Sequence, residues 1–215
     1  MALVKKESVD NTEEKGQPAQ KRHVLRGPGG LLEQLNDPTP QVRRWAIRDL
    51  SAFAEAVKPL CQHLKSEPVE VVREAVFTSL ATIGGREVVE CLVPLLRSED
   101  AAMRNNAIEV LQQLPEEMES HMEMLLEDED VDVRGFAIDI MNGLGHAKIP
   151  EWLATLLTTE EDLNVCAKAA ESLAEVGLPT HIPALQGLLR RFPDVPYLTF
   201  TVELAIRRIA AGNGG

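Results

Sequence analysis

The feature that most constrains the fold is a dipeptide, usually Val-Arg, that returns at a nearly fixed interval. It occurs as Val42-Arg43, Val72-Arg73, Met103-Arg104, Val133-Arg134 and Val165-Cys166. The second residues stand at positions 43, 73, 104, 134 and 166, so the steps are 30, 31, 30 and 32 residues. An interval in this range is typical of a stacked array, in which no unit buries its apolar face alone.

Apolar residues follow each dipeptide at helical spacing. After Arg134, for example, Ala137, Met141 and Leu144 recur, and Gly145 comes directly after them. Apolar positions at offsets of −1, +3, +7 and +10 fit a period of 3.6 residues and cannot fit a strand. The pattern as a whole predicts paired helices along the chain.

The expected pairs are 31–36 with 40–54, 56–65 with 69–83, 86–97 with 101–113, 116–126 with 131–143, 148–158 with 162–176, and 180–191 with 197–210. Pro94 lies inside the segment 86–97, which should therefore start late or kink. The chain is thus predicted to be all-α, a right-handed α-solenoid of about six helix-pair repeats over residues 29–215.

Charged residues recur at the turns between the paired helices. Asp37, Glu67, Asp128 and Glu160 each stand six residues before the second residue of the dipeptide, where we expect them to cap the second helix. Four arginines in register, Arg43, Arg73, Arg104 and Arg134, could bind a polyanion. Because acidic residues recur at the same turns, we expect these arginines to pair with them and hold the stack.

The last unit lacks the dipeptide. Its apolar residues Leu198, Val202, Ala205 or Ile206, and Ile209 are expected to seal the end of the array. Terminal repeats differ from internal ones because they cap the stack.

Charge is unevenly distributed and limits the choice of partner. The whole chain carries a net charge of −12, of which residues 1–27 contribute +2, so residues 28–215 carry −14. We interpret residues 1–28 as a disordered polar tail. An acidic body repels a phosphate backbone, which argues against nucleic acid and favours a basic segment of another protein.

Localisation is predicted from the absence of targeting signals and from the cysteines. No apolar run approaches the roughly 18–20 residues of a membrane helix, and the N-terminus lacks the apolar core of a secretory signal. Cys61, Cys91 and Cys166 lie in helical patterns, without a CxxC motif and in odd number. Reduced, buried thiols in a cytoplasmic protein are therefore expected.

Three stretches, VVREAVFTSLATIG, VDVRGFAIDIMNGLG and LNDPTPQVRRWAIRDL, carry a resemblance to a known family. They resemble the HEAT-like repeats first described in phycobilisome lyase subunits, whose motif is Val-Arg-x-x-Ala-x-x-x-Leu, often followed by Gly. The resemblance covers about residues 29–210 and implies a HEAT-like solenoid. It does not select a function, because similar proteins include lyases, hydroxylases, glycosylases and scaffolds.

No metal, cofactor or catalytic residue is predicted. HEAT-repeat deoxyhypusine hydroxylases hold two irons with His-Glu pairs, but His23, His63, His121, His146 and His181 are followed here by Val, Leu, Met, Ala and Ile. The acidic run at 128–132 begins like a calcium loop, yet its sixth position is Val133 instead of glycine. No Cys or Ser stands beside a His in an arrangement that indicates nucleophilic catalysis.

A partner is expected in a concave groove lined by the second helices. Residues at offsets +1, +2, +5, +8 and +9 should point outward there. The candidate groove residues are Arg44, Trp45, Arg48, Thr78, Asn105, Asn106, Glu109, Phe136, Asp139, Asn142, Lys168 and Glu171. Trp45 and Phe136 share offset +2, where they would form either an exposed hot spot or packing contacts with neighbouring helices.

A second candidate surface is the acidic segment 116–132, which contains no Lys or Arg. Such a run is either a solvated face or a surface that steers a basic segment.

We therefore expect a non-catalytic adaptor that grips a peptide or helix of another protein. The alternative is a bilin lyase or isomerase subunit acting on a phycobiliprotein, because subunits of that kind carry the resembling repeats. Homodimerisation through a terminal repeat is left open.

Overall fold

A computed structural model describes residues 27–212 of the chain. The predicted disordered tail lies outside the described residues except for its last two positions. Of these, Gly27 is the N-cap of the first helix and Pro28 is its first residue.

Six pairs of α-helices account for nearly all of residues 27–212, and no strand occurs among these residues. Their bounds are α1 Pro28–Gln34, α2 Pro40–Leu50, α3 Val57–Leu64, α4 Glu70–Ile83, α5 Arg86–Leu92, α6 Ala101–Leu111, α7 Pro115–Leu126, α8 Val131–Leu144, α9 Ile149–Thr159, α10 Leu163–Val176, α11 Ile182–Arg191 and α12 Pro196–Ala211. Short 3₁₀ turns span Ala54–Ala56, Val93–Arg97 and Pro179–His181. The predicted all-α solenoid is confirmed.

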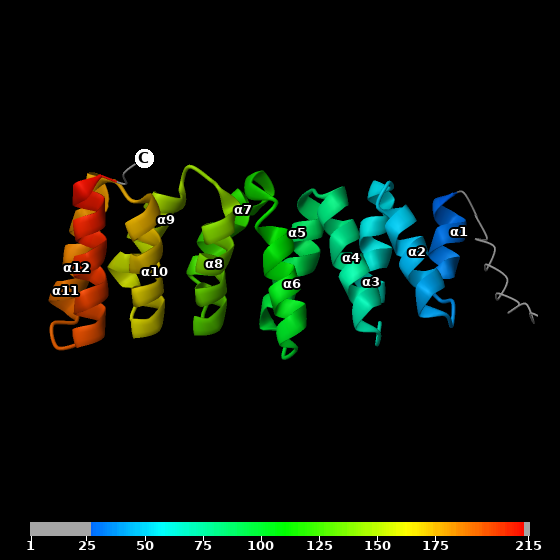
Figure 1. Ribbon diagram of the computed structural model, residues 1–215, viewed down its shortest axis with the longest axis horizontal. Helices are drawn as coiled ribbons and strands as arrows, with labels where there is room; N and C mark the ends of the chain where they lie inside the picture. Colours follow the sequence, from blue (N-terminus) through cyan, green and yellow to red (C-terminus); the bar gives the residue numbers. More distant parts are fainter. Residues whose placement is uncertain (1–26, 213–215) are drawn as a thin grey trace, which may run out of the picture.

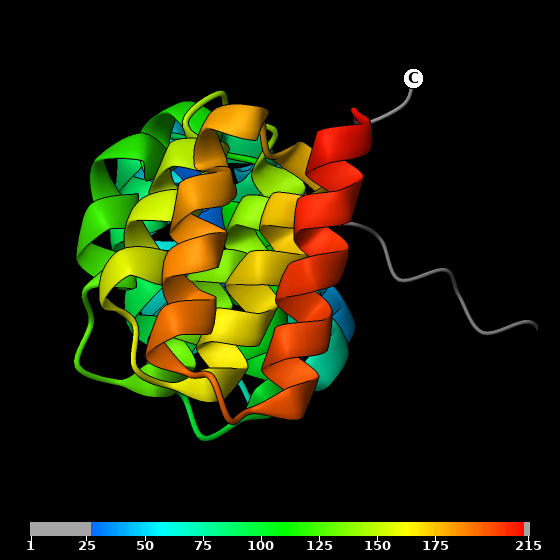
Figure 2. The same ribbon diagram turned by 90° about the vertical axis from the view of Figure 1, so that its left-hand side faces the viewer.

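The helices form two layers along one axis (Figure 1). Each even-numbered helix contacts the next, from α2 to α12, and each odd-numbered helix from α3 to α11 does the same. Viewed from the C-terminal end, α11 and α12 are the last pair of the stack (Figure 2). We call the outer surface of the even-numbered helices the even-helix face.

The core contains the predicted positions at offsets +3 and +7 in all five repeats, whereas offset +10 is buried only in part. Leu114 and Leu144 are buried there, but Val176 is 42% exposed. At offset +3, Ala46, Val76, Ala107, Ala137 and Ala169 are at most 1% exposed. Small residues at this position let neighbouring helices approach closely, and the large aliphatic residues at offset +7 fill the space between layers. Each fully buried Leu, Ile or Val contributes about 1.5–3 kcal/mol through removal of apolar surface from water.

The prediction about helix caps is wrong by two residues. Side chains that cap second helices are Asp100, Asp130 and Asp162, which accept backbone N–H groups of the first helical turn. The acidic residues predicted as caps instead accept the N–H two residues ahead, as Glu67 does from Val69 at 3.0 Å. They therefore order the turn and leave a carboxylate oxygen for another partner.

Pro94 interrupts its helix as expected. α5 ends at Leu92, and the chain continues as a 3₁₀ turn over Val93–Arg97. A proline in a helix interior removes a hydrogen bond and clashes with the preceding turn, so the tighter 3₁₀ turn accommodates it.

The expectation of three reduced thiols is wrong for two of them. Cys61 of α3 and Cys91 of α5 form a disulfide that joins neighbouring repeats, and both are half-buried. Cys166 is free and buried. Stable disulfides are uncommon in a reducing cytosol, so the cysteines no longer support a cytoplasmic location.

In the last repeat, Leu198, Val202, Ala205 and Ile209 are buried, and Ile206 is half-buried. Ala205 is therefore the core residue of the two alternatives. Among residues 27–212, no helix combines the length and apolar character that a membrane span requires.

Candidate protein-binding face

Two of the four register arginines form bidentate ion pairs that join neighbouring repeats. Arg43 donates through Nε to Glu67 Oε2 at 2.8 Å and through Nη2 to Oε1 at 2.6 Å. Arg134 repeats this geometry with Glu160, at 2.7 and 2.9 Å. Both pairs are largely buried. The structural role expected for these arginines is thereby confirmed.

The same arginines also bind their own turns. Arg43 Nη1 donates to the Asp37 carbonyl at 2.9 Å, and Arg134 Nη1 donates to the Asp128 carbonyl at 2.8 Å. Each guanidinium therefore fastens a turn of one repeat to the acidic residue of the next. Such planar, charge-assisted contacts suit arginine and not lysine.

The ion pairs perturb the carboxylates. Burial by itself raises the pKa of Glu67 and of Glu160, but hydrogen bonds from arginine and from the backbone outweigh it. The net effect holds the pKa of both residues below the ordinary value of 4.5. Both therefore remain ionised partners of arginine at neutral pH.

The other two register arginines lack this partner. The third repeat has Ser98 at the position of Glu67, so the carboxylate nearest to Arg73 is that of Asp100, at 3.9 Å. Arg73 Nη1 still donates to the Glu67 carbonyl of its own turn, at 3.3 Å. Arg104 donates to the Ser98 carbonyl at 2.6 Å and lies over the ring of Phe136, 5.6 Å from its centroid.

Asp128, the acidic residue that corresponds to Glu67 in the fourth repeat, forms an ion pair with Arg97 instead. Among the described residues, Arg104 therefore has no carboxylate partner.

The fifth repeat replaces the register arginine with a cysteine. Cys166 Sγ donates weakly to the Glu160 carbonyl at 3.4 Å, and Arg191 of α11 donates to the same carbonyl and to that of Leu157 at 2.7 Å. Burial raises the pKa of Cys166 to about 11, so this thiol is not a nucleophile at neutral pH. Sequence reasoning missed Arg191, which comes from the next repeat.

The even-helix face has clefts between successive helices. The α4/α6 cleft, of about 330 Å³, is lined by Glu74, Phe77, Thr78, Ala81, Thr82, Asn106, Glu109, Val110 and Gln113. Two clefts lie between α8 and α10, a lower one near the N-terminal ends of these helices and an upper one toward their C-terminal ends. The lower α8/α10 cleft, of about 240 Å³, is lined by residues that include Gly135, Phe136, Asn164 and Lys168.

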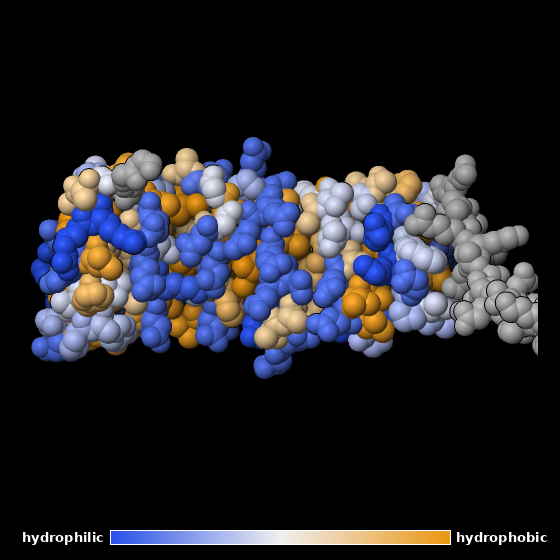
Figure 3. Space-filling model, in the orientation of Figure 1, coloured by the Kyte–Doolittle hydropathy of each residue, from blue (hydrophilic) through white to orange (hydrophobic). Residues whose placement is uncertain are grey.

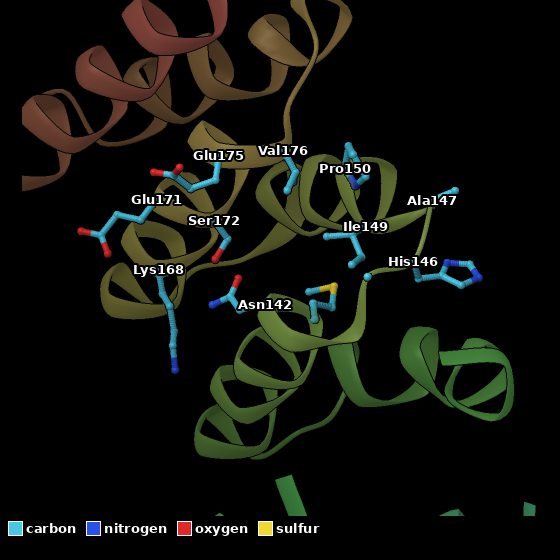
Figure 4. A pocket seen from close by; sticks show the side chains of 12 residues that line it. Asn142, His146, Ala147, Ile149, Pro150, Lys168, Glu171, Ser172, Glu175 and Val176 are labelled. Atoms are coloured by element: carbon cyan, nitrogen blue, oxygen red, sulfur yellow. The ribbon is translucent and has the colours of Figure 1, made fainter. Parts of the chain in front are cut away.

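The upper α8/α10 cleft is larger than these two, at about 700 Å³, and is lined by residues that include Met141, Asn142, Lys168, Glu171, Ser172 and Glu175 (Figure 4). Asn142 points across the cleft toward α10, and His146 lines its edge with the ring directed outward (Figure 4).

The predicted groove residues divide between these clefts and the surface around them. Thr78, Asn106 and Glu109 line the α4/α6 cleft. Phe136, Asn142, Lys168 and Glu171 line the two α8/α10 clefts. Arg44, Trp45, Arg48, Asn105 and Asp139 line none of these three.

Several candidate side chains are already engaged within the array. Lys168 Nζ donates to Asp139 at 2.6 Å and to the Gly135 carbonyl at 3.0 Å. Asn106 donates to the Ala102 carbonyl at 2.8 Å within its own helix. These contacts fix the side chains that form the walls of the clefts.

The two aromatic residues at offset +2 do not form one surface. Trp45 lies on α2 and Phe136 on α8, and both are half-buried. Phe136 packs against the core and is covered by Arg104. For Phe136, packing with neighbouring helices is therefore what the structure contains.

Sequence comparison identifies the repeats. The family described as HEAT repeats matches residues 29–112 and 118–206, which is most of the chain. The chain belongs to the HEAT-repeat family.

One curated relative of this HEAT protein is 28% identical over 191 residues, which covers 83% of this chain and 93% of the relative. It is described as an uncharacterized phycocyanin operon protein Z of Pseudanabaena tenuis (strain PCC 7409).

Two solved structures are also similar. An archaeal HEAT-like repeats protein from Thermococcus onnurineus NA1 has 16% identity and a TM-score of 0.44, over 87% of this chain and 88% of that chain. The complex of CpcE and CpcF of phycocyanin lyase from Nostoc sp. PCC7120 has 17% identity and a TM-score of 0.37, over 94% of this chain and 100% of that chain.

The acidic segment 116–132 of the HEAT array is partly neutralised. Glu119 pairs with Lys148 at 2.5 Å, and Asp128 pairs with Arg97. Asp128 and Asp130 also accept backbone N–H groups at 2.9 Å, so the resemblance to a calcium loop reflects turn geometry. No group of three or more His, Cys, Asp or Glu side chains suited to a metal occurs among the described residues.

Proposed function

We propose that this HEAT protein is a non-catalytic adaptor that binds a peptide or helix of another protein on its even-helix face. The observation that carries the proposal is the row of clefts between α4 and α6 and between α8 and α10. Peptide-binding grooves combine such concave surfaces with a few polar side chains that fix orientation.

The charge of the clefts indicates the partner's chemistry. Glu74, Glu109 and Glu171 are exposed at the cleft walls, and the carboxylates of these three form no ion pair within residues 27–212. The arginines that could compensate them are held by turns and carboxylates of the stack. A partner segment that contains Lys or Arg therefore complements this face.

The proposal is tested by charge reversal on the cleft walls. Basic peptides would be selected from a random peptide library with the full-length protein, and their dissociation constants measured by fluorescence anisotropy. Glu109→Lys combined with Glu171→Lys should weaken binding at least tenfold, whereas Glu55→Lys, at an exposed position outside the clefts, should leave it unchanged. Equal affinity for all three proteins would contradict the proposal.

A second candidate function is that of a bilin lyase or isomerase subunit. It is favoured by the relative described as a phycocyanin operon protein, which matches nearly its whole length. Covalent attachment of a bilin to this chain is not expected, because Cys166 is buried with a raised pKa and the other two cysteines are paired.

The two functions are separated by a transfer assay. Purified protein, apo-phycocyanin and free phycocyanobilin would be mixed with and without a second phycocyanin lyase subunit. Growth of the visible absorbance of holo-phycocyanin only when this chain is present would favour the lyase subunit over the adaptor.

A further inference from the structure

The last helix leaves one apolar stripe uncovered. Tyr197, Phe200 and Leu204 of α12 are 47%, 64% and 41% exposed. Their spacing of three and four residues places them on one side of the helix, away from the buried side formed by Leu198 and Val202. An apolar patch is visible over α12 in Figure 3. The end of the array is therefore not sealed, although its predicted core residues are buried.

Charged residues flank this stripe with opposite signs at its two ends. Asp194 precedes α12 and lines a shallow depression of about 520 Å³ together with Phe200 and Glu203. Arg207 and Arg208 lie in the last turns of α12 and are exposed. They form exposed ion pairs with Glu203 and Glu175, which contribute little in water.

The apolar and charged residues of this stripe stand in an order that would match a second α12 running in the opposite direction. Tyr197 and Leu204 are equidistant from the midpoint between Phe200 and Thr201, and so are Asp194 and Arg207. If a second α12 is laid antiparallel on the first, Tyr197 faces Leu204 of the other copy. Asp194 then faces Arg207 of the other copy at both ends of the contact.

We infer that α12 is the interface of a homodimer, in which two copies of this chain pack their last helices antiparallel about a two-fold axis. A two-fold interface requires a surface that is complementary to itself, and the order of apolar and charged residues along the stripe meets this condition. One pair of helices buries less than a standard interface, so the dimer should dissociate in the micromolar range.

The inference is independent of the proposed peptide binding. None of the three residues of the stripe lines the α4/α6 cleft or either α8/α10 cleft. The dimer would leave these clefts open and present each of them twice, which increases the avidity for a partner with two binding segments.

Sedimentation equilibrium of the full-length protein tests the inference. The wild type should form dimers at tens of micromolar. Phe200→Asp combined with Leu204→Asp should weaken association at least tenfold, whereas Met124→Asp, at an equally exposed apolar residue of α7, should leave it unchanged. Circular dichroism melting of each variant confirms that it is folded.

A charge exchange tests the two-fold geometry itself. Asp194→Arg and Arg207→Asp should each weaken the dimer, because like charges then face each other across the interface. The double variant should recover dimerisation to within about threefold of the wild type.

A wild type that remains monomeric at 200 µM (roughly a hundredfold above a typical micromolar constant) overturns the inference. So does a dimer that survives the Asp substitutions at Phe200 and Leu204, or a double charge variant that shows no recovery. Binding of a library peptide that depends on Phe200 in a monomeric wild type would assign the stripe to a foreign helix instead.

Discussion

At the junction between α8 and α10, Arg134 forms two hydrogen bonds to Glu160, whereas Arg104, at the same repeat position one junction earlier, lies over the ring of Phe136. Both arginines donate to the carbonyl of the turn six residues before them. The contact inside the repeat is therefore constant, and the contact between repeats is variable.

The two junctions differ because the acidic residue of the following repeat differs in length and in its other partners. Glu160 is long enough to accept both its own turn's N–H groups and the arginine of the previous repeat. Asp128, its counterpart for Arg104, is one methylene shorter and is paired with Arg97. The repeat pattern therefore fixes the position of each arginine, whereas the side chains of the neighbouring repeat determine which group it binds.

The largest effect is expected where the ion pair is buried. Arg134→Ala should lower the free energy of unfolding by about 3–5 kcal/mol, because it leaves the Glu160 carboxylate buried without its partner. Urea denaturation measures the change. Arg48→Ala, at an exposed position of α2, is the control and should change stability by less than about 0.5 kcal/mol. A loss below about 1 kcal/mol for Arg134→Ala would remove the distinction between the two junctions.

The next effect concerns the covalent junction between α3 and α5. Replacing Cys61 and Cys91 by Ser should cost about 3 kcal/mol, because the disulfide closes a loop of 30 residues in the unfolded chain. Reduction with dithiothreitol should lower the Tm of the wild type to that of the double variant. It should leave the Tm of the double variant unchanged. If the reductant shifts both proteins equally, the bond does not stabilise the array.

Acid should destabilise the array by protonating the carboxylates of the two buried ion pairs. The folded-state pKa of Glu160 and of Glu67 lies below 4.5, so the unfolded chain binds protons more readily than the folded chain. Their contribution is complete above about pH 5 and is lost as the pH falls below 4.5. Tm measured from pH 7 to pH 3 should fall less steeply for Glu160→Gln than for the wild type. Parallel curves would disprove this source of acid sensitivity.

Arg104→Ala provides the other half of the comparison. It should cost only about 1 kcal/mol, since it removes one hydrogen bond and a half-exposed cation–π contact and strands no carboxylate. The same urea titration is the measurement. A cost equal to that of Arg134→Ala would mean that Phe136 replaces glutamate without loss.

The smallest effect is a gain. Ser98→Glu restores the acidic residue that the third repeat lacks and should add about 0.5–1 kcal/mol by giving Arg73 a carboxylate at the usual place. Ser98→Gln has nearly the same shape without the charge and should add less. If both variants are equally stable, the missing carboxylate does not explain the weaker junction.

The sequence predicts most of the fold because the same short pattern recurs in nearly every repeat. The helix pairs, the buried residues at offset +3 and the break at Pro94 all follow from local spacing. The shift of the caps from Glu67-type positions to Asp100, Asp130 and Asp162 was not predicted, because both sets are acidic and lie two residues apart.

The candidate site is less predictable, because it depends on contacts between repeats. The disulfide between Cys61 and Cys91 joins the first helices of neighbouring repeats, and their separation of 30 residues is within one residue of the step between these repeats. That signal could have been found by comparing cysteine spacing with the period. The contact of Arg104 with the Phe136 ring depends on the side chains of the adjacent repeat. Phe200 is exposed because no described helix packs against that side of α12.

Because Cys166 stands where the first four repeats have arginine, the turn of the fifth repeat is bound by an arginine of the sixth repeat. Arg191 donates to the Glu160 carbonyl of this turn. In each of the first four repeats, the arginine of the same repeat donates to the corresponding carbonyl. In a nearest-neighbour description of the array, this contact belongs to the coupling between the fifth and sixth units and not to the intrinsic stability of the fifth unit. During synthesis, the turns of the first four units can bind their own arginines, whereas the turn of the fifth receives its arginine only after α11 has been made.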